Sequence, residues 1–401
     1  MTSFFAHRLS LIKPSPTLEI TAKAAALKAA GQDIIGLGAG EPDFDTPDFI
    51  KKAALKALER GETKYTNVEG TLTLRKAIAQ KFLKDNHLTY DPSEIIVSCG
   101  AKHVLFNALM ATLNPGDEVI IPAPYWVSYP DMSLLFGGIP TIIKTKEQNH
   151  FKVTPESLEQ AITKRTKWFI LNSPSNPTGM CYTEKELIDL GKVLKKYPHV
   201  WILSDDIYEH LVFEKFIFTT LAEAVPDLKD RILTVNGVSK TYAMTGWRIG
   251  YGAGPKPLID AMKMLQSQST SNATSIAQSA ATEALLGDQH FIEDFRKSFE
   301  ERRNMVVDLL NTCPGLHCLK PDGAFYVYPS ATGLIGKKTP KGGLLKSDSD
   351  IAAYFLDYVG VAVVPGEAFG LSPYFRISYA TGINILKDAC HRIKNACESV
   401  V

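Results

Sequence analysis

The feature that most constrains the fold of this chain is an alternation of short apolar runs with longer stretches of helical spacing. Most of the short runs are almost continuously apolar, as in a parallel sheet that helices cover on both faces. They span residues 94–98, 118–121, 141–144, 168–171, 200–204, 231–235 and 248–252. Helical stretches separate them, such as 101–113, which ends at an Asn-Pro-Gly-Asp turn. The pattern predicts an α/β protein with a mostly parallel sheet.

The pattern changes after about residue 275. Apolar side chains on one side of residues 290–312 predict a long amphipathic helix that links two domains. The elements expected beyond it form a smaller α+β unit: strands at 325–328, 362–364 and 375–379, and helices at 349–358 and 385–398. We therefore expect an N-terminal arm that joins the small domain (1–47), a large domain (48–290) and a small C-terminal domain (291–401). The Gly/Lys-rich segment 331–346 matches no phosphate-loop spacing and is expected to be a mobile surface loop.

Composition excludes several classes of function. With 44 Lys and Arg against 43 Asp and Glu, the chain of 401 residues has a net charge of +1. It therefore has no overall positive electrostatic field that would attract nucleic acid or an anionic membrane. No apolar stretch approaches the roughly 20 residues that cross a bilayer, and no secretory signal is evident, so a cytoplasmic location is expected. The six cysteines form no CxxC pair and the nine histidines no HExxH motif, which argues against a metal site.

Several residues with useful chemistry lie where predicted strands end. Lys240 follows the run 231–235, Asp205 ends the run 200–204 with Tyr208 just beyond it, Asn176 follows 168–171, and Gly100 opens a predicted helix. Open α/β sheets bind ligands at the carboxyl ends of their strands, so these residues are expected to meet in one crevice.

Each of these residues also has an ordinary explanation. Taken alone, Lys240 reads as a solvated lysine, Asp205 as a helix N-cap, Asn176 as part of a turn and Gly100 as a common helix start. Together they match the needs of an aldehyde-bearing pyridine cofactor. It requires an amine for an imine linkage, a carboxylate for the ring nitrogen, donors for the phenolic oxygen and a phosphate site at a helix N-terminus.

Longer motifs identify the family that the chain resembles. They are GAGEPDFDTP (38–47), KYTNVEG (64–70), PAPYWVSYP (122–130), NSPSNPTG (172–179), SDDIYEHL (204–211) and SKTYAMTGWRIGYG (239–252). With the segments at 13–15 and 375–380 they cover nearly the whole chain. The sequence resembles the pyridoxal-phosphate aminotransferases of fold type I, and most closely the prokaryotic (Ib) aspartate aminotransferase group. This resemblance implies a three-layer αβα large domain with a seven-stranded sheet and a smaller α+β domain.

The resemblance also implies the roles of individual residues toward pyridoxal 5'-phosphate. Lys240, Asp205 and Tyr208 would be catalytic: the amine would form the imine, the carboxylate would partner the ring nitrogen, and Tyr208 would bind the phenolic oxygen together with Asn176. Trp126 would stack on the ring, and the phosphate would be held by Gly100, Ala101, Ser239 and Arg248. Lys102 and Tyr65 complete the residues implied at the cofactor. Tyr65 would reach the neighbouring subunit's site, which implies a homodimer with composite active sites.

The substrates implied are amino acids and 2-oxo acids. Arg376 would bind the α-carboxylate together with Gly40 and Asn176, and Trp126 would also contact the substrate. Dicarboxylate recognition is associated with Lys102, Lys13, Ser15 and Thr17. Some relatives also use prephenate. Without the family motifs, Trp126 reads as packing and Arg376 as the outward residue of an edge strand. Glu69, in a segment that departs from the form common in relatives, adds a carboxylate that bears on side-chain specificity.

The implied reaction is a ping-pong transamination in which Lys240 acts as general base and acid. Three other functions remain open from the sequence. A different enzyme on the same cofactor is one, such as an aromatic or alanine aminotransferase or a lyase. A nicotinamide dehydrogenase is another, although the glycines at 36–40 lack the GxGxxG spacing. The third is a cofactor-binding regulator, for which no helix-turn-helix extension is evident.

Overall fold

The structure, a computed structural model, describes residues 4–401. Its largest sheet has seven strands in the order β2-β8-β7-β6-β5-β3-β4. These strands are β2 (Ile95–Ser98), β3 (Glu118–Ala123), β4 (Ile139–Lys144), β5 (Thr166–Asn172), β6 (Trp201–Asp205), β7 (Ile232–Gly237) and β8 (Gly250–Ala253). They correspond to the seven apolar runs, and all are parallel except β8, which is antiparallel to both neighbours. The predicted mostly parallel α/β fold is confirmed.

Helices cover both faces of this sheet. Successive side chains of a strand point to opposite faces, and in β5 Trp168 and Ile170 pack on one layer while Phe169 and Leu171 pack on the other. The first layer contains α4 (Ala101–Thr112), α5 (Ser128–Leu135) and α9 (Lys256–Ser267). The second contains α2 (Asp48–Glu59), α3 (Leu72–Asn86), α6 (Pro155–Ala161), α7 (Glu184–Lys195), α8 (Leu221–Ala224) and α10 (Ser275–Leu286). Burial on both sides explains why the strands are almost uniformly apolar.

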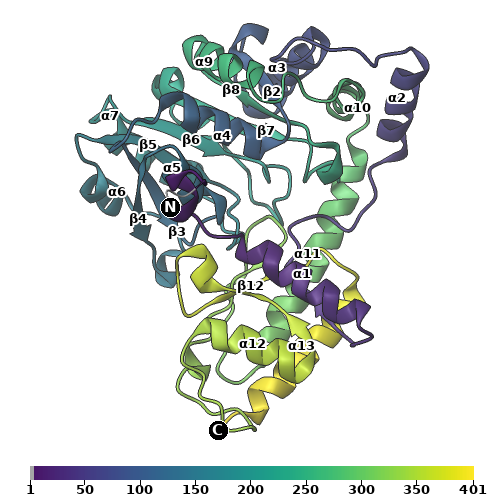
Figure 1. The fold of residues 1–401 in the computed structure, drawn as a ribbon, viewed down its shortest axis with the longest axis vertical. Coiled ribbons are helices and arrows are strands. Elements are labelled where there is room, and N and C mark those ends of the chain that lie inside the picture. The colour runs from purple at the N-terminus through teal and green to yellow at the C-terminus, as the bar shows by residue number, and fades with distance from the viewer. Residues whose placement is uncertain (1–3) are drawn as a thin grey trace.

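A smaller part of the molecule lies below the large sheet in Figure 1, and α11 (His290–Leu310) runs from one to the other. It contains the antiparallel sheet β11-β12-β9, built from β9 (Tyr326–Val327), β11 (Val364–Pro365) and β12 (Phe375–Ser378). The helices α12 (Asp348–Val359) and α13 (Ile383–Ser399) pack against it. The proposed domain division at residues 47 and 290 stays a prediction.

The N-terminal segment returns to this smaller part. α1 (Pro16–Ala29) packs its buried Ala24 against Leu356 and Ala362, and β1 (Ile35–Gly36) pairs in parallel with β10 (Val361–Ala362). The prediction of one strand over 362–364 is wrong, because the chain there divides into β10 and β11, which pair with different partners. A purely apolar run does not reveal such a break. The glycines at 36–40 lead into a loop, and no helix begins between them and Asp48.

Two further observations bear on the earlier expectations. The segment 331–346 contains a short 3-10 helix (Thr332–Leu334) and a bridge between Lys338 and Leu344, and none of its residues lines the candidate-site cavity described below. Within residues 4–401, no helix combines the length and the apolar character needed to cross a membrane.

Candidate active site

One cavity, with a volume of about 280 Å³, collects most of the residues that the sequence singles out. The neighbouring strands β5, β6 and β7 end beside it and deliver Asn176, Asp205 and Lys240. The other predicted residues on its wall come from the N-terminal segment, the start of α4, three loops and β12, and they are Ser15, Thr17, Gly40, Ala101, Lys102, Trp126, Tyr208, Ser239, Arg248 and Arg376. The carboxyl edge of a parallel sheet is the place where such a site is expected.

Asp205 is the last residue of β6, and its side chain is buried. The Tyr129 hydroxyl donates a hydrogen bond to Oδ2 at 2.6 Å, and the backbone N–H of Ile207 donates to Oδ1 at 3.4 Å. Burial raises the pKa of Asp205 to about 6, against the opposing effects of these donors and of the Lys240 ammonium. Turns, not a helix, follow at 207–210, so the N-cap explanation is wrong. A buried carboxylate of this kind suits a cationic partner.

Lys240 lies three residues beyond β7, and its ammonium Nζ donates to the backbone oxygen of Gly40 at 2.5 Å. Burial lowers the pKa of Lys240 to about 8; Arg248 and Arg376 act in the same direction, whereas Glu41 and Asp205 oppose them. This is not a solvated surface lysine. A pKa near 8 gives a usable fraction of neutral, nucleophilic amine close to neutral pH.

The start of α4 and Arg248 form one end of the cavity. Gly100 precedes the helix with φ of 91°, and a Cβ on it would collide with the guanidinium of Arg248. Glycine therefore allows Arg248 to lie against the helix start, where no side chain caps the backbone N–H groups. Ala101 and Ser239 line the cavity beside it. A helix N-terminus and a guanidinium together attract a multiply charged anion such as phosphate.

Tyr208 and Asn176 occupy another wall. The hydroxyls of Tyr208 and Tyr326 lie 2.8 Å apart, and burial keeps the pKa of Tyr208 well above its usual value, so it remains a protonated donor. Asn172 fixes the neighbouring backbone: its Oδ1 accepts from the N–H of Asn176 and its Nδ2 donates to the oxygen of Asp205, each at 2.8 Å. These contacts explain why both asparagines of the NSPSNPTG motif bear on the site.

Arg376 is a fully buried cation, with 2% of its surface exposed. It lies on β12, the middle strand of its sheet, so the interpretation as an outward edge residue is wrong. Its Nη1 donates to Oδ1 of Asn176 at 2.9 Å and its Nη2 to the oxygen of Gly38 at 2.6 Å, while Nε is buried without a partner. No carboxylate within residues 4–401 pairs with it, which leaves its charge available for an anionic ligand.

Lys102 provides a second cation on the cavity wall. It is the second residue of α4, and its Nζ lies 4.8 Å from the centre of the Trp126 ring. Burial lowers its pKa, and Arg248 adds to the effect. In the part of the chain that the structure describes, no carboxylate lies within ion-pair distance of it. Arg376 and Lys102 thus offer two positive groups to one ligand.

Some predicted residues lie off the cavity wall. Lys13 is exposed, and its charge acts on Asp131; Tyr65 is 91% exposed; and Gly100 contributes through its contact with Arg248. Glu69 does not line the cavity either. Its carboxylate lies 3.0 Å from Lys263 Nζ and 3.5 Å from Arg75, so its charge is balanced outside this site.

Sequence reasoning missed several residues of the wall. Tyr129 binds Asp205, Tyr326 binds Tyr208 and faces Arg376 at 4.6 Å, and Asn172 holds two loops in place. Tyr129 and Asn172 lie inside motifs that the sequence analysis quotes. No pattern in the sequence distinguishes Tyr326 from a tyrosine of the core.

Comparisons with known proteins agree with this geometry. The family model for aminotransferase class I and II matches residues 32–393. The aspartate/prephenate aminotransferase of Cereibacter sphaeroides is 58% identical over 395 residues, covering 98% of this chain and 99% of that protein. A solved structure of the aspartate aminotransferase from Rhizobium meliloti superposes with a TM-score of 0.97 at 53% identity, covering 100% of both chains. The Thermus thermophilus aspartate aminotransferase with maleate gives a TM-score of 0.92 at 40% identity, covering 98% of this chain and 100% of that one. The chain belongs to the class I and II aminotransferase family.

Proposed function

We propose that this protein is a pyridoxal-phosphate-dependent aspartate aminotransferase that exchanges amino groups between L-aspartate or L-glutamate and the corresponding 2-oxo acids. The single observation that carries the substrate assignment is the buried, unpaired guanidinium of Arg376 with the second cation of Lys102 on the same cavity wall. Two positive groups suit the two carboxylates of a dicarboxylic amino acid. The relatives named aspartate aminotransferase, and the Thermus structure with the dicarboxylate maleate, support the same assignment.

The residues of the cavity fit the cofactor that this family implies. A buried acid at Asp205 suits a ring nitrogen that keeps its proton, and the Tyr208 hydroxyl and Asn176 suit a phenolic oxygen. The uncapped start of α4, with Ser239 and Arg248, suits the phosphate. Trp126 would lie on the ring face. When bound, pyridoxal phosphate supplies an aldehyde for the amine and a cationic ring that accepts electrons from the substrate α-carbon.

The protein's own groups then bind, orient and move protons. Arg376 holds the α-carboxylate with its planar fork, and Lys102 holds the distal carboxylate, so the substrate is fixed at both ends. Lys240 Nζ would take the proton from the substrate α-carbon and give it to the carbon that the cofactor aldehyde supplies, and a pKa of about 8 suits both steps near neutral pH. Asp205 contributes a fixed negative charge inside a buried site, where it acts strongly.

Prephenate is a second acceptor that the relatives' names favour, since several are named aspartate/prephenate aminotransferases. Ser15 and Thr17 line the cavity beside the start of α1 and are positioned to contact a larger substrate. We also propose a homodimer. Tyr65 is 91% exposed, so its aromatic ring is not packed within one subunit, and this supports a role across an interface.

The test is a panel of amino donors and acceptors on cofactor-loaded protein. We expect transfer from aspartate to 2-oxoglutarate, slower transfer from alanine and phenylalanine, and measurable transfer to prephenate. Loss of all transfer in Lys240→Ala is the control for catalysis at this site. Preference for alanine or phenylalanine over aspartate would replace the assignment with another aminotransferase activity.

A further inference from the structure

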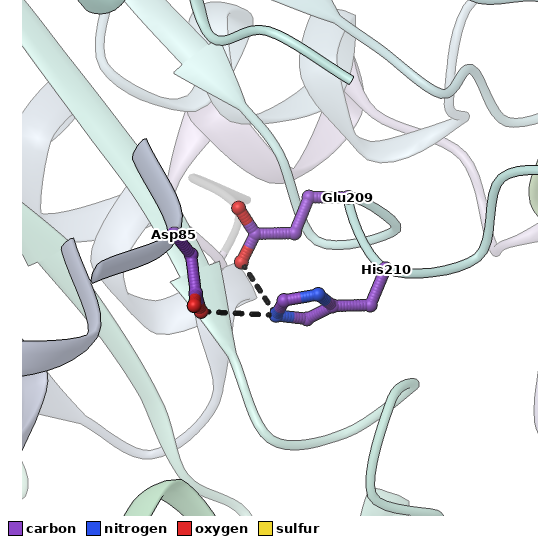
Figure 2. A group of neighbouring side chains, drawn as sticks. All are labelled: Asp85, Glu209 and His210. Atoms are coloured by element: carbon purple, nitrogen blue, oxygen red, sulfur yellow. Dashed lines mark ion pairs between the residues drawn. The ribbon is translucent and has the colours of Figure 1, made fainter. Parts of the chain in front are cut away.

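A buried polar cluster lies behind the cavity, around Glu209. The Glu209 carboxylate forms an ion pair with the ammonium of Lys81 on α3, and the side chains of both residues are 3% exposed. The amide of Asn86 donates to its Oε2 at 3.0 Å and the amide of Asn236 to its Oε1 at 2.7 Å. Figure 2 shows His210 beside it, with Nε2 at 3.3 Å from Glu209 and 3.5 Å from Asp85.

The arrangement of Asp85, Glu209 and His210 resembles a set of metal ligands, since their donor atoms lie within 4.8 Å of one another. The surroundings argue against a metal ion. Lys81 already supplies the positive charge at Glu209, and an asparagine amide donates to each of its carboxylate oxygens. Burial alone would raise the pKa of Glu209, but Lys81 and the other donors outweigh it and lower the pKa, so the carboxylate stays ionised.

The position of this carboxylate in the fold suggests a different role. Glu209 follows Tyr208 directly and lies four residues after Asp205, in the turns between β6 and the isolated bridge at Val212. Asn236 lies on β7, four residues before Lys240. The contact between Glu209 and Asn236 therefore joins the segment that carries the acid and the phenol to the strand that leads to the amine.

β6 and β7 are themselves paired as far as Asp205 and Val235, and beyond that pair few other polar contacts join the turns at 206–210 to β7. The N–H of Asp206 donates to the oxygen of Val235 at 2.9 Å, and the Asp206 carboxylate accepts from Ser204 and Thr220, which hold it on its own side of the turn. Glu209 alone of the acids on this turn reaches both α3 and β7 among the described residues. Replacing both partners of a buried ion pair by apolar residues is often neutral for stability, so stability alone does not explain the placement of this pair.

We propose that Glu209 is a positioning residue that fixes Asp205 and Tyr208 relative to Lys240. The inference rests on the proposed function, because it is the transamination site whose geometry the contact sets. Lys81 and Asn86 hold the Glu209 carboxylate on α3, and the hydrogen bond from Asn236 connects the same carboxylate to β7. Small displacements of catalytic groups are costly: about 1 Å can reduce a rate about 100-fold.

Two variants test the proposal. Glu209→Gln removes the charge and keeps the shape, and Asn236→Ala leaves the Lys81 ion pair intact while it cuts the tie to β7. Glu118→Gln is the matched control, because Glu118 is also a buried carboxylate, with Arg165 at 2.6 Å, but it begins β3 at the end remote from the cavity. Each protein is loaded with pyridoxal phosphate, and the pH titration of the visible absorbance is measured with kcat, KM and the unfolding temperature.

We expect the titration midpoint to rise by at least about 0.5 pH unit in both test variants. The absorbance follows the loss of a proton from the imine nitrogen. A positive charge on the ring nitrogen lowers the pKa of that imine. A looser Asp205 stabilises the ring charge less well, so the imine pKa, and with it the midpoint, should rise. We also expect kcat to fall between about 10-fold and 100-fold with a smaller change in KM. Glu118→Gln should lower the unfolding temperature without moving the midpoint.

The outcomes separate this inference from the proposed function. Wild-type protein that shows no Lys240-dependent visible absorbance would overturn both. A normal wild-type titration, with midpoints within about 0.1 unit of it in Glu209→Gln and Asn236→Ala, would overturn the positioning role alone. A midpoint shift of the same size in Glu118→Gln would do so as well, because it would reduce the effect to general destabilisation.

Discussion

Replacing Lys102 by methionine tests the two-cation model of substrate binding most directly. Lys102 lines the cavity, and its Nζ lies 4.8 Å from the centre of the Trp126 ring, which also lines it. Methionine keeps most of the lysine stem and removes the charge. Alanine would also remove the packing, and its effect would mix two causes.

The size of the effect follows from the surroundings of Lys102. A fully exposed ion pair contributes about 0.2–1 kcal/mol, whereas a hydrogen bond to a charged group contributes about 1.5–3 kcal/mol. Lys102 is partly buried on a cavity wall and has no carboxylate partner within residues 4–401, so we take the larger range. At about 1.4 kcal/mol for each factor of ten, kcat/KM for aspartate should fall between about 10-fold and 150-fold.

The assay is the ratio of kcat/KM for aspartate to that for alanine, both with a saturating oxo acid. Alanine has no distal carboxylate, so its kcat/KM should change by less than about threefold. Lys102→Arg retains a cation and should keep most of the preference for aspartate. Equal losses for aspartate and alanine in Lys102→Met would refute the reasoning, because the residue would then act on the cofactor or on the fold and not on the distal carboxylate.

Four other predictions test the remaining parts of the site. Lys240→Ala should lower turnover by at least about 1000-fold and abolish the visible absorbance of loaded protein, measured in one sample; normal activity would disprove the assignment. Arg376→Lys keeps the charge but loses the fork, so kcat/KM should fall about 10-fold to 150-fold for aspartate and alanine alike, and a loss for only one of them would contradict it. In cofactor-free protein, acylation of Lys240 followed by peptide mass spectrometry should have its midpoint at pH about 8, not near the ordinary lysine value of about 10.4. Mixed dimers of Lys240→Ala and Tyr65→Ala subunits should regain activity, because one of their two composite sites carries neither change; no regain after verified exchange would argue against a shared site.

Much of the fold could be predicted from the sequence because the signal is local. A strand buried on both faces must be apolar along its length, and each of the seven runs became a strand of the large sheet. The ends were less accurate: the run at 248–252 begins as a strand only at Gly250, since Arg248 adopts a left-handed backbone with φ of 56°. The short strands β1 and β10 were harder still, because each pairs with a strand more than 300 positions away.

The site was predictable where a residue belongs to a motif and less so where it acts through space. Lys240, Asp205 and Asn176 follow strands, and the order of strands in the sheet brings them together. Tyr326 could not be predicted, because its role depends on a hydroxyl contact with a residue 118 positions away. The network of Lys81 and Glu209 was equally hidden, since a lysine on a helix reads as solvated until its partner is known.

The unpaired charges of the cavity have a consequence for stability as well as for binding. The pKa of Asp205 is raised to about 6 in the folded protein, so between pH 4 and 6 the native state binds more protons there than the unfolded chain, and this group lowers stability as pH rises. Lys240 acts in the opposite direction at higher pH: with its pKa at about 8, the native state holds fewer protons than the unfolded chain up to the ordinary lysine range. Near neutral pH both groups therefore carry charges that burial disfavours, and Arg376 adds a third. A ligand that presents a cation to Asp205 and an anion to Arg376 relieves the costs at these two groups in the native state alone. Binding energy and folding energy are thus linked at this site, because the same buried groups that make it reactive leave the protein less stable without its ligands.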